Sequence, residues 1–123
     1  MKLGYWTQFV AVAVALVIVD LPWLTLISGD YMRAVQQIQC GKEVRTRPIA
    51  GAIVYPALAY LSLKTKSLNE ALLTGMAVYA VYDFTVLAVF EKYPLYLAVA
   101  DSLWGGTLFS IVYYLRSRFL ESF

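Results

Sequence analysis

The sequence predicts an all-α, polytopic membrane protein with four transmembrane helices and a short interfacial helix between the first and the second. Composition is the first observation: 61% of the 123 residues are hydrophobic and 15% are charged, whereas soluble domains average roughly 45–50% apolar and about 25% charged residues. The second is that the apolar residues form long blocks, separated by short polar stretches that hold the lysines and arginines. We therefore expect one membrane-embedded domain over residues 1–123.

The first transmembrane helix is expected over about residues 3–27. Its apolar run begins at Phe9 and resumes after Asp20, which gives about 25 residues, enough to span a bilayer with tilt. A secretory signal peptide is the alternative for this run, but the return of apolar residues after Asp20 favours a retained helix. Pro22 removes one backbone hydrogen bond, so a kink is expected at the depth of Asp20.

The polar stretch that follows predicts a short helix at the membrane interface, over about residues 30–40. Tyr31, Ala34 and Ile38 repeat with helical spacing, while charged and amide side chains take the opposite face. Gly41 is expected to end this helix because glycine adopts the left-handed conformation of helix C-termini.

The second and third transmembrane helices are expected over residues 48–63 and about 68–91. Pro48 is well suited to the first position of a helix, where its missing N–H is not needed. Ser67 and Glu70 have the spacing of a capping box directly before the third apolar run. The third helix is therefore expected to begin near residue 68.

The fourth transmembrane helix is expected over residues 94–115, with both chain termini on the same side of the membrane. Lysines and arginines are divided evenly between the two sides, so their count does not fix the orientation; the short basic ends favour termini in the cytoplasm. Aromatic residues close to the helix ends, Tyr31 and Tyr93 among them, are expected in interfacial belts without further chemistry.

Three aspartates inside the apolar runs are the main functional signal. Two of them, Asp20 and Asp101, are each followed three residues later by a tryptophan, Trp23 and Trp104. Counting from the expected helix ends places these two and Asp83 roughly 10–12 Å below the same membrane surface, at 1.5 Å per residue. Since a charged side chain at this depth costs on the order of 2.5–3.5 kcal/mol, we expect all three to face the bundle interior and to share one site.

The expected transmembrane helices contain no lysine or arginine to neutralise these acids. They must therefore be partly protonated, hydrogen-bonded as neutral acids, or neutralised by an external proton or cation. Tyrosine hydroxyls and the tryptophan indole N–H groups are the expected hydrogen-bond donors, the indoles acting across a helix interface. The candidate residues for a ligand, proton or cation site are Asp20, Asp83, Asp101, Tyr79, Tyr55, Tyr82, Trp23 and Trp104.

Several classes of chemistry lack their usual residues in this chain. There is no histidine and only one cysteine, so haem, zinc and disulfide chemistry are not expected and any metal would be a hard cation held by oxygen. No catalytic set and no cofactor motif is present.

The net charge of +2 is small and the basic residues are scattered along the chain, which argues against nucleic acid as a partner. The expected partners are membrane lipid and either another membrane protein or a second copy of the chain.

Three functional hypotheses follow from these observations. The first is an integral membrane protein whose aspartates hold the bundle together or bind a proton or hard cation, possibly for transport. The second is a structural or interaction subunit of a larger membrane assembly. The third is a lipid-modifying membrane enzyme, or its accessory protein, in which an aspartate acts as acid or base.

The motifs also resemble those of an uncharacterised family, a domain of unknown function found in small four-helix membrane proteins of bacteria and large viruses. The resemblance rests on Asp20 with Trp23 in the first helix, on Tyr82-Asp83-Phe84-Thr85 in the third, and on Asp101 with Trp104-Gly105 in the fourth. The family signature in the third helix reads Tyr-Asp-Leu-Thr-Asn, and this chain departs from it at Phe84 and Val86. The resemblance implies a fold and a set of motif positions rather than an activity.

Overall fold

The computed structural model describes residues 4–41 and 47–120, and all regular structure in these two ranges is helical. The helices are α1 (Tyr5–Ile38), α2 (Pro48–Leu63), α3 (Leu68–Val89) and α4 (Leu95–Leu115), and α4 continues into a π-helical turn, η1 (Arg116–Leu120). The four α-helices agree with the fold class that the sequence predicts.

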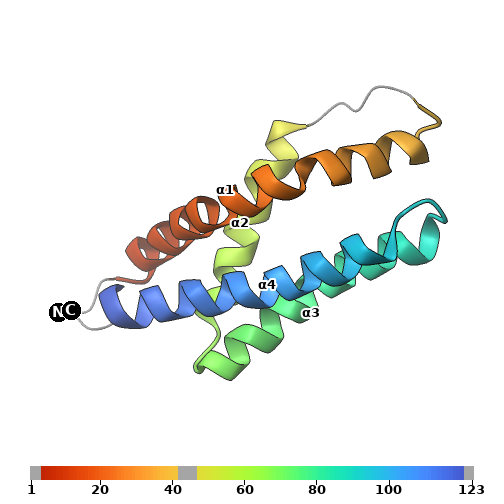
Figure 1. Ribbon diagram of the computed structural model, residues 1–123. Helices are drawn as coiled ribbons and strands as arrows, with labels where there is room; N and C mark the ends of the chain where they lie inside the picture. The colour runs from red at the N-terminus through yellow and green to blue at the C-terminus, as the bar shows by residue number, and fades with distance from the viewer. Residues whose placement is uncertain (1–3, 42–46, 121–123) are drawn as a thin grey trace.

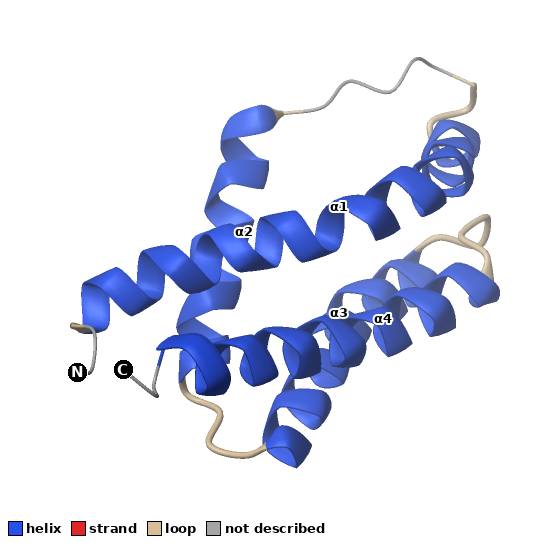
Figure 2. Cartoon of the chain, turned by 60° about the vertical axis from the view of Figure 1, so that its left-hand side comes forward, coloured by secondary structure: helices blue, strands red, loops and turns tan. Residues whose placement is uncertain are grey.

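The helices are arranged around a tight hairpin of α3 and α4 (Figure 1). The start of α1 and the end of α4 lie at one end of the molecule, which we call the terminal end. The end of α1 and the connection between α3 and α4 lie at the opposite end, the loop end. α2 crosses the other three helices steeply in both views (Figure 2).

α1 is a single helix of 34 residues, so the separate interfacial helix expected over residues 30–40 is wrong. The polar stretch contains no proline, and Gly29 in a helix interior costs only about 1 kcal/mol. The ion pair between Arg33 and Asp30, three residues apart, adds to the support for helix here. At 1.5 Å per residue α1 is about 50 Å long and therefore exceeds the roughly 30 Å hydrocarbon core of a bilayer.

The C-terminus of α1 ends in a pair of left-handed residues. Cys40 has φ 60° and Gly41 has φ 84°. The Cys40 N–H donates to the Gln37 carbonyl at 3.2 Å, and the Gly41 N–H donates to the Gln36 carbonyl at 2.8 Å. These are the two hydrogen bonds of a Schellman motif. Gly41 thus takes part in ending the helix as expected, but a non-glycine residue also adopts the left-handed conformation.

Local signals explain the starts of α2 and α3. Pro48 is the first residue of α2. Ser67 caps α3 by accepting the Glu70 N–H at 3.1 Å, and the Glu70 carboxylate accepts the Lys66 N–H at 2.6 Å. The reciprocal bond of the capping box is therefore made one residue earlier than its standard form. α3 ends at Val89, slightly before the expected boundary.

Glycines allow the backbones of α3 and α4 to touch. A Cβ atom on Gly75 would lie 2.1 Å from the Gly105 carbonyl oxygen, and one on Gly105 would lie 2.4 Å from the Tyr79 ring. A Cβ on Gly106 would lie 2.4 Å from Cγ of Met76. Such contacts between small residues are typical of membrane helix pairs, which have no hydrophobic driving force between them in lipid.

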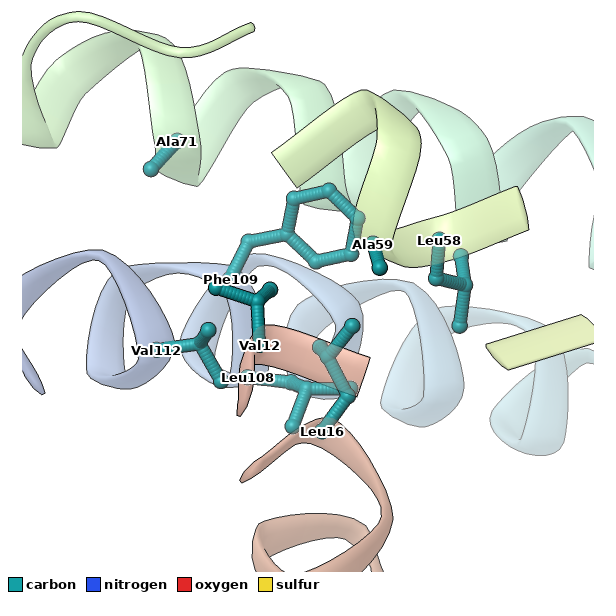
Figure 3. Close-up of a cluster of buried hydrophobic side chains, with 8 residues drawn as sticks. All are labelled: Val12, Leu16, Leu58, Ala59, Ala71, Leu108, Phe109 and Val112. Atoms are coloured by element: carbon teal, nitrogen blue, oxygen red, sulfur yellow. The ribbon is translucent and has the colours of Figure 1, made fainter. Parts of the chain in front are cut away.

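Buried apolar side chains form two clusters at opposite ends of the molecule. The loop core lies near the α3–α4 connection and consists of Ala34, Tyr93, Leu97 and Ala98. The larger terminal core joins all four helices (Figure 3) and consists of Val12, Leu16, Leu58, Ala59, Ala71, Leu108, Phe109 and Val112.

Three of the helices are long and apolar enough to cross a membrane: α1, α3, and α4 together with its π-helical extension. α2 is equally apolar but has only 16 residues. The outside of the described chain carries many exposed large hydrophobic side chains, as expected of a surface that faces lipid.

Candidate functional site: a buried aspartate network

Two aspartates on α1 and α4 are bonded in a reciprocal pattern. The Trp104 indole N–H donates to Oδ1 of Asp20 at 2.7 Å, and the Trp23 indole N–H donates to Oδ1 of Asp101 at 3.0 Å. Each helix thus supplies one acid and one donor to the other. The donation across a helix interface that the sequence suggests is present in both directions.

The repeated Asp-x-x-Trp spacing explains this pattern. Residues three apart lie on the same helix face, and α1 and α4 run in opposite directions. Asp20 therefore lies opposite Trp104 while Trp23 lies opposite Asp101. The two indole rings stack between the pairs, with centroids 5.5 Å apart and an interplanar angle of 14°.

Asp20 also connects the pair to α2. The Tyr55 hydroxyl donates to Oδ2 of Asp20 at 2.6 Å, so both carboxylate oxygens accept a hydrogen bond. The Asp20 side chain is buried, with 3% relative exposure. This single acid therefore joins α1, α2 and α4, and as an acceptor at both oxygens it is satisfied without a proton of its own.

Asp83 on α3 is the most completely buried of the three acids, with 0% relative exposure. Oδ1 accepts the Tyr93 hydroxyl at 2.7 Å, whereas Oδ2 is buried and has no hydrogen-bond partner among the described residues. The Asp101 carboxyl lies beside Asp83 and interacts with it directly. Asp83 therefore combines one unpaired oxygen with an acidic neighbour.

Tyr93 reaches Asp83 from the short connection between α3 and α4, and its own side chain is only 2% exposed. Burial raises the pKa of the Tyr93 hydroxyl above its ordinary value, and the hydrogen bond to Asp83 raises it further. The hydroxyl therefore stays protonated at neutral pH and remains a donor to the carboxylate.

Two further tyrosines lie next to this contact. The hydroxyls of Tyr31 on α1 and Tyr82 on α3 are hydrogen-bonded to each other. The Tyr31 ring packs edge-on against the Tyr93 ring, with centroids 6.5 Å apart. Tyr82 is half exposed, at 50%. Tyr93, the donor to Asp83, thus packs against a hydrogen-bonded tyrosine pair whose second member is half exposed.

Tyr79 occupies the middle of the network. Its ring packs against Gly105 at the α3–α4 contact, and its hydroxyl lies within electrostatic range of Tyr55 and of the three acids, of which Asp20 and Asp83 are buried. Among the residues the structure describes, no hydrogen bond is made by this hydroxyl. Tyr79 therefore brings a hydroxyl that is not hydrogen-bonded to a described residue into the middle of the network.

The family is settled by comparison with known proteins. The model of the family described as "Predicted membrane protein (DUF2177)" matches residues 5–115. The chain belongs to this family. No curated protein and no solved structure matches the chain. The DUF2177 match runs from the start of α1 to the end of α4 and so includes every residue of the aspartate network.

The DUF2177 protein is accordingly a multi-pass membrane protein. The family description carries no activity, so the chemistry must be argued from the network itself. Four of its hydrogen bonds join different helices or a helix and a connection, and every donor is a neutral aromatic side chain.

The expected common depth of the three acids is only approximate. Asp83 and Asp101 are neighbours across the α3–α4 hairpin, but Asp20 is level with Trp104, which is three residues, or about 4.5 Å, farther along α4 than Asp101. The depth of Asp20 was counted from Ile27, yet α1 does not end there. In the described part of the chain, the acids form no set of three or more ligands for a metal ion.

Two functionally placed residues are not singled out by the sequence pattern. The sequence predicts that Tyr93 belongs to an interfacial belt, but in the structure its hydroxyl donates to Asp83. The only sequence feature that could have indicated this contact is its position directly before Pro94, in the turn that follows α3. Arg116 reads as a helix exit signal but is buried and donates to the carbonyls of Ser62 at 2.6 Å and Thr65 at 2.5 Å. It caps the C-terminus of α2 from the terminal end.

Two surface hollows of the DUF2177 protein lie away from the acids. One, of 510 Å³, is at the loop end and is lined by Gln36, Gln37, Cys40, Gly41 and Lys92. The other, of 200 Å³, is at the terminal end between α1 and α4 and is lined by Ala11, Val12, Ala15, Val112, Leu115, Arg116 and Phe119. Neither is lined by an aspartate, so the acids face their aromatic donors rather than these hollows.

Proposed function

We propose that this protein binds and releases a proton inside the membrane, on the carboxyl pair of Asp83 and Asp101. The observation that carries the proposal is the Oδ2 atom of Asp83, which is fully buried beside Asp101 without a hydrogen bond from the described chain. α3 and α4 contain no lysine or arginine that could pair with it.

A shared proton accounts for this arrangement. Two adjacent carboxylates in a medium of low polarity repel each other strongly, and one proton held between them removes the repulsion. The protonated member then donates an O–H to the other and so provides the missing partner of Asp83 Oδ2. The pair binds the proton as a unit rather than at one residue.

A proton fits the site better than a hard cation. Ca²⁺ requires about six to eight oxygen ligands and Mg²⁺ requires a near-ideal octahedral set, whereas the described acids form no group of three. One oxygen of each carboxylate already accepts a hydrogen bond, from Trp23 at Asp101 and from Tyr93 at Asp83.

Proton release in solution tests the proposal. The pH of the purified full chain in detergent is raised in weak buffer from about 6, above the ordinary range of aspartate, to alkaline values, and the protons released are counted. We expect Asp83→Asn to release about one proton fewer than the unmodified protein, since a carboxyl pair that shares a proton titrates as one unit in this range. Asp30→Asn, at the exposed ion pair with Arg33, is the matched acidic control. Equal release by Asp83→Asn and Asp30→Asn would contradict the proposal.

The topology that we propose includes α2 as the fourth span. α1 ends at the loop end and α3 begins at the terminal end, so the chain between them must return across the membrane. α2 is about 24 Å long at 1.5 Å per residue, a few ångströms short of a typical hydrocarbon core, and bilayers accommodate such mismatch at modest cost.

This topology is tested by placing single cysteines at Arg47 and Lys64 in a Cys40→Ser background. The accessibility of each cysteine to a membrane-impermeant thiol reagent is then measured. Labelling of both positions from the same side would contradict it.

An interaction subunit is the second candidate function, and one observation favours it. Residues 48–54 of α2 are exposed on every face, and a Cβ atom on Gly51 would meet nothing within 4 Å. Ile49 and Ile53 are 81% and 65% exposed. We propose that a transmembrane helix of a partner protein packs on this half of α2. Photocrosslinking from position 49 should then capture a partner at fixed stoichiometry, whereas crosslinks to lipid alone would contradict this candidate.

A further inference from the structure

The surroundings of the Asp83–Asp101 pair differ on its two sides. Toward the loop end the next groups are the hydroxyls of Tyr93, Tyr31 and Tyr82. Toward the terminal end the next layers are the α3–α4 glycine contact and the terminal core. On the terminal side Tyr79, Tyr55 and Asp20 lie near the pair, but the apolar terminal core follows them, whereas the loop side continues in tyrosines.

We propose that the proton reaches the Asp83–Asp101 pair only from the loop end, through the hydroxyl of Tyr93. This inference rests on the proposed function and adds the route and the side of access. A tyrosine hydroxyl can donate one hydrogen bond and accept another. Tyr93 donates to Asp83 at 2.7 Å, so its O–H bond breaks toward the carboxylate as its oxygen accepts a proton from water at the loop end, and the tyrosine is neutral before and after the step.

Two further tyrosines lie beside Tyr93 on the side away from Asp83. Tyr93 has almost no exposed surface of its own, but its ring contacts Tyr31, whose hydroxyl is bonded to that of Tyr82. Tyr82 is half exposed. Because α1 is longer than the bilayer core and ends at the same end, this group of hydroxyls lies toward the membrane boundary rather than at its centre.

The terminal side is closed by apolar packing. Leu16, Leu108 and Phe109 are all 0% exposed, and they meet between α1, α2 and α4 (Figure 3). The Gly75 and Gly105 backbones touch directly between the acids and this layer. These apolar side chains supply no donor or acceptor that could pass on a proton, and a dry apolar layer does not conduct one.

The groups that face the pair are known for every element packed against it. Among the residues that the structure describes, none of these groups is basic, so none of them is a fixed cation that holds the pair in its ionised state. By element these groups are Asp20 and Tyr31 on α1, Tyr55 on α2, Tyr79 and Tyr82 on α3, and Tyr93 in the connection. Protonation of the pair therefore responds to the pH at the loop end, with Asp20 as its only acidic neighbour outside the pair.

The test uses the full chain in sealed vesicles. Trp6→Phe leaves two tryptophans, Trp23 and Trp104, of the three in the chain, and both are hydrogen-bonded to acids of the network. Cys40 is the single cysteine and is exposed at the loop end, so an impermeant thiol reagent reports which way each molecule faces. The pH is then changed outside or inside the vesicles, and tryptophan emission is followed.

We expect emission to change only when the pH changes on the side where Cys40 is accessible. Tyr93→Phe should retain the final amplitude but slow the change on the order of 10²-fold, as loss of a positioned proton-transfer group does. Tyr96→Phe, which alters an exposed tyrosine on α4, is the matched control and should leave the rate unchanged. Phe109→Ala, which opens the terminal core, should make the response two-sided.

The outcomes separate this inference from the proposed function. A response from the terminal side, an equal response from both sides, or an unchanged rate in Tyr93→Phe would overturn one-sided access while leaving proton binding intact. The absence of any response in the unmodified protein, or its persistence in Asp83→Asn, would overturn proton binding and the inference with it.

Discussion

The reciprocal bonding of α1 and α4 makes a prediction that sequence spacing alone would not make. On each helix an aspartate and a tryptophan are three residues apart, so the simplest expectation is a bond within one helix. The structure instead pairs Asp20 with Trp104 and Asp101 with Trp23. Energetic coupling should therefore connect residues on different helices and not neighbours on the same helix.

The magnitude follows from the geometry of the Trp104 bond. Hydrogen bonds between membrane helices contribute about 0.6 kcal/mol on average and at most about 1.7 kcal/mol. The bond to Asp20 is short, at 2.7 Å, and its acceptor is 3% exposed, so it belongs at the upper end, about 1.5 kcal/mol. Trp104→Phe keeps an aromatic ring for the stack with Trp23 and removes only the N–H donor.

A double-mutant cycle measures this coupling. Asp20→Leu, which keeps the branching of aspartate without its acceptors, is combined with Trp104→Phe and, separately, with Trp23→Phe. Unfolding free energies come from denaturation of the full chain in mild detergent. We expect a coupling of about 1–1.5 kcal/mol for Asp20 with Trp104, and less than about 0.5 kcal/mol for Asp20 with Trp23, the range found for residues that do not share an interaction. A larger coupling within α1 than between the helices would refute the reasoning.

Three further substitutions test the packing around the network. Gly105→Ala should destabilise the protein by about 2 kcal/mol or more because its Cβ would lie 2.4 Å from the Tyr79 ring; Gly51→Ala, where a Cβ meets nothing within 4 Å, should be neutral or stabilising by about 0.5 kcal/mol. Arg116→Met should cost on the order of 2 kcal/mol by removing the cap of α2, whereas Arg118→Met, at an exposed side chain, should cost little in the same thermal denaturation assay. Tyr55→Phe should lower stability by about 1 kcal/mol through loss of its bond to Asp20, and a stability equal to that of the unmodified protein would show that this bond contributes nothing.

The membrane class and the helix starts were predictable because local chemistry decides them. Long apolar blocks leave no alternative to burial in lipid. Pro48 at the start of α2 and Ser67 as the cap of α3 act within a few residues of their own position. Such signals depend little on the rest of the fold, so the sequence is sufficient to read them.

The length of α1 was not predictable because tertiary contacts determine it. The sequence over residues 28–30 contains serine, glycine and aspartate, which read locally as a break. In the fold, Ala34 belongs to the loop core beside the α3–α4 connection, and Tyr31 packs against it. Packing of this segment against the other helices outweighs the weak local preference for a turn.

The site was predictable at the level of residues but not of pairs. The free-energy cost of a charge in the membrane identifies the three acids, and the Asp-x-x-Trp spacing identifies both tryptophans. The pairing of Asp20 with Trp104, however, depends on the register of α1 against α4. Tyr93 was missed for a different reason. A tyrosine next to a helix end is usually interfacial, and only the path of the α3–α4 connection brings its hydroxyl back to Asp83.

The infrared spectrum of the full chain tests the central claim most directly, because a protonated carboxyl and a carboxylate absorb separately. At neutral pH we predict a carboxylic acid band in the unmodified protein that is absent from both Asp83→Asn and Asp101→Asn and unchanged in Asp30→Asn. That result would place one proton on the pair, since either substitution removes the repulsion that holds it there. A spectrum with carboxylate bands alone at neutral pH would contradict the account, because both acids would then be ionised side by side.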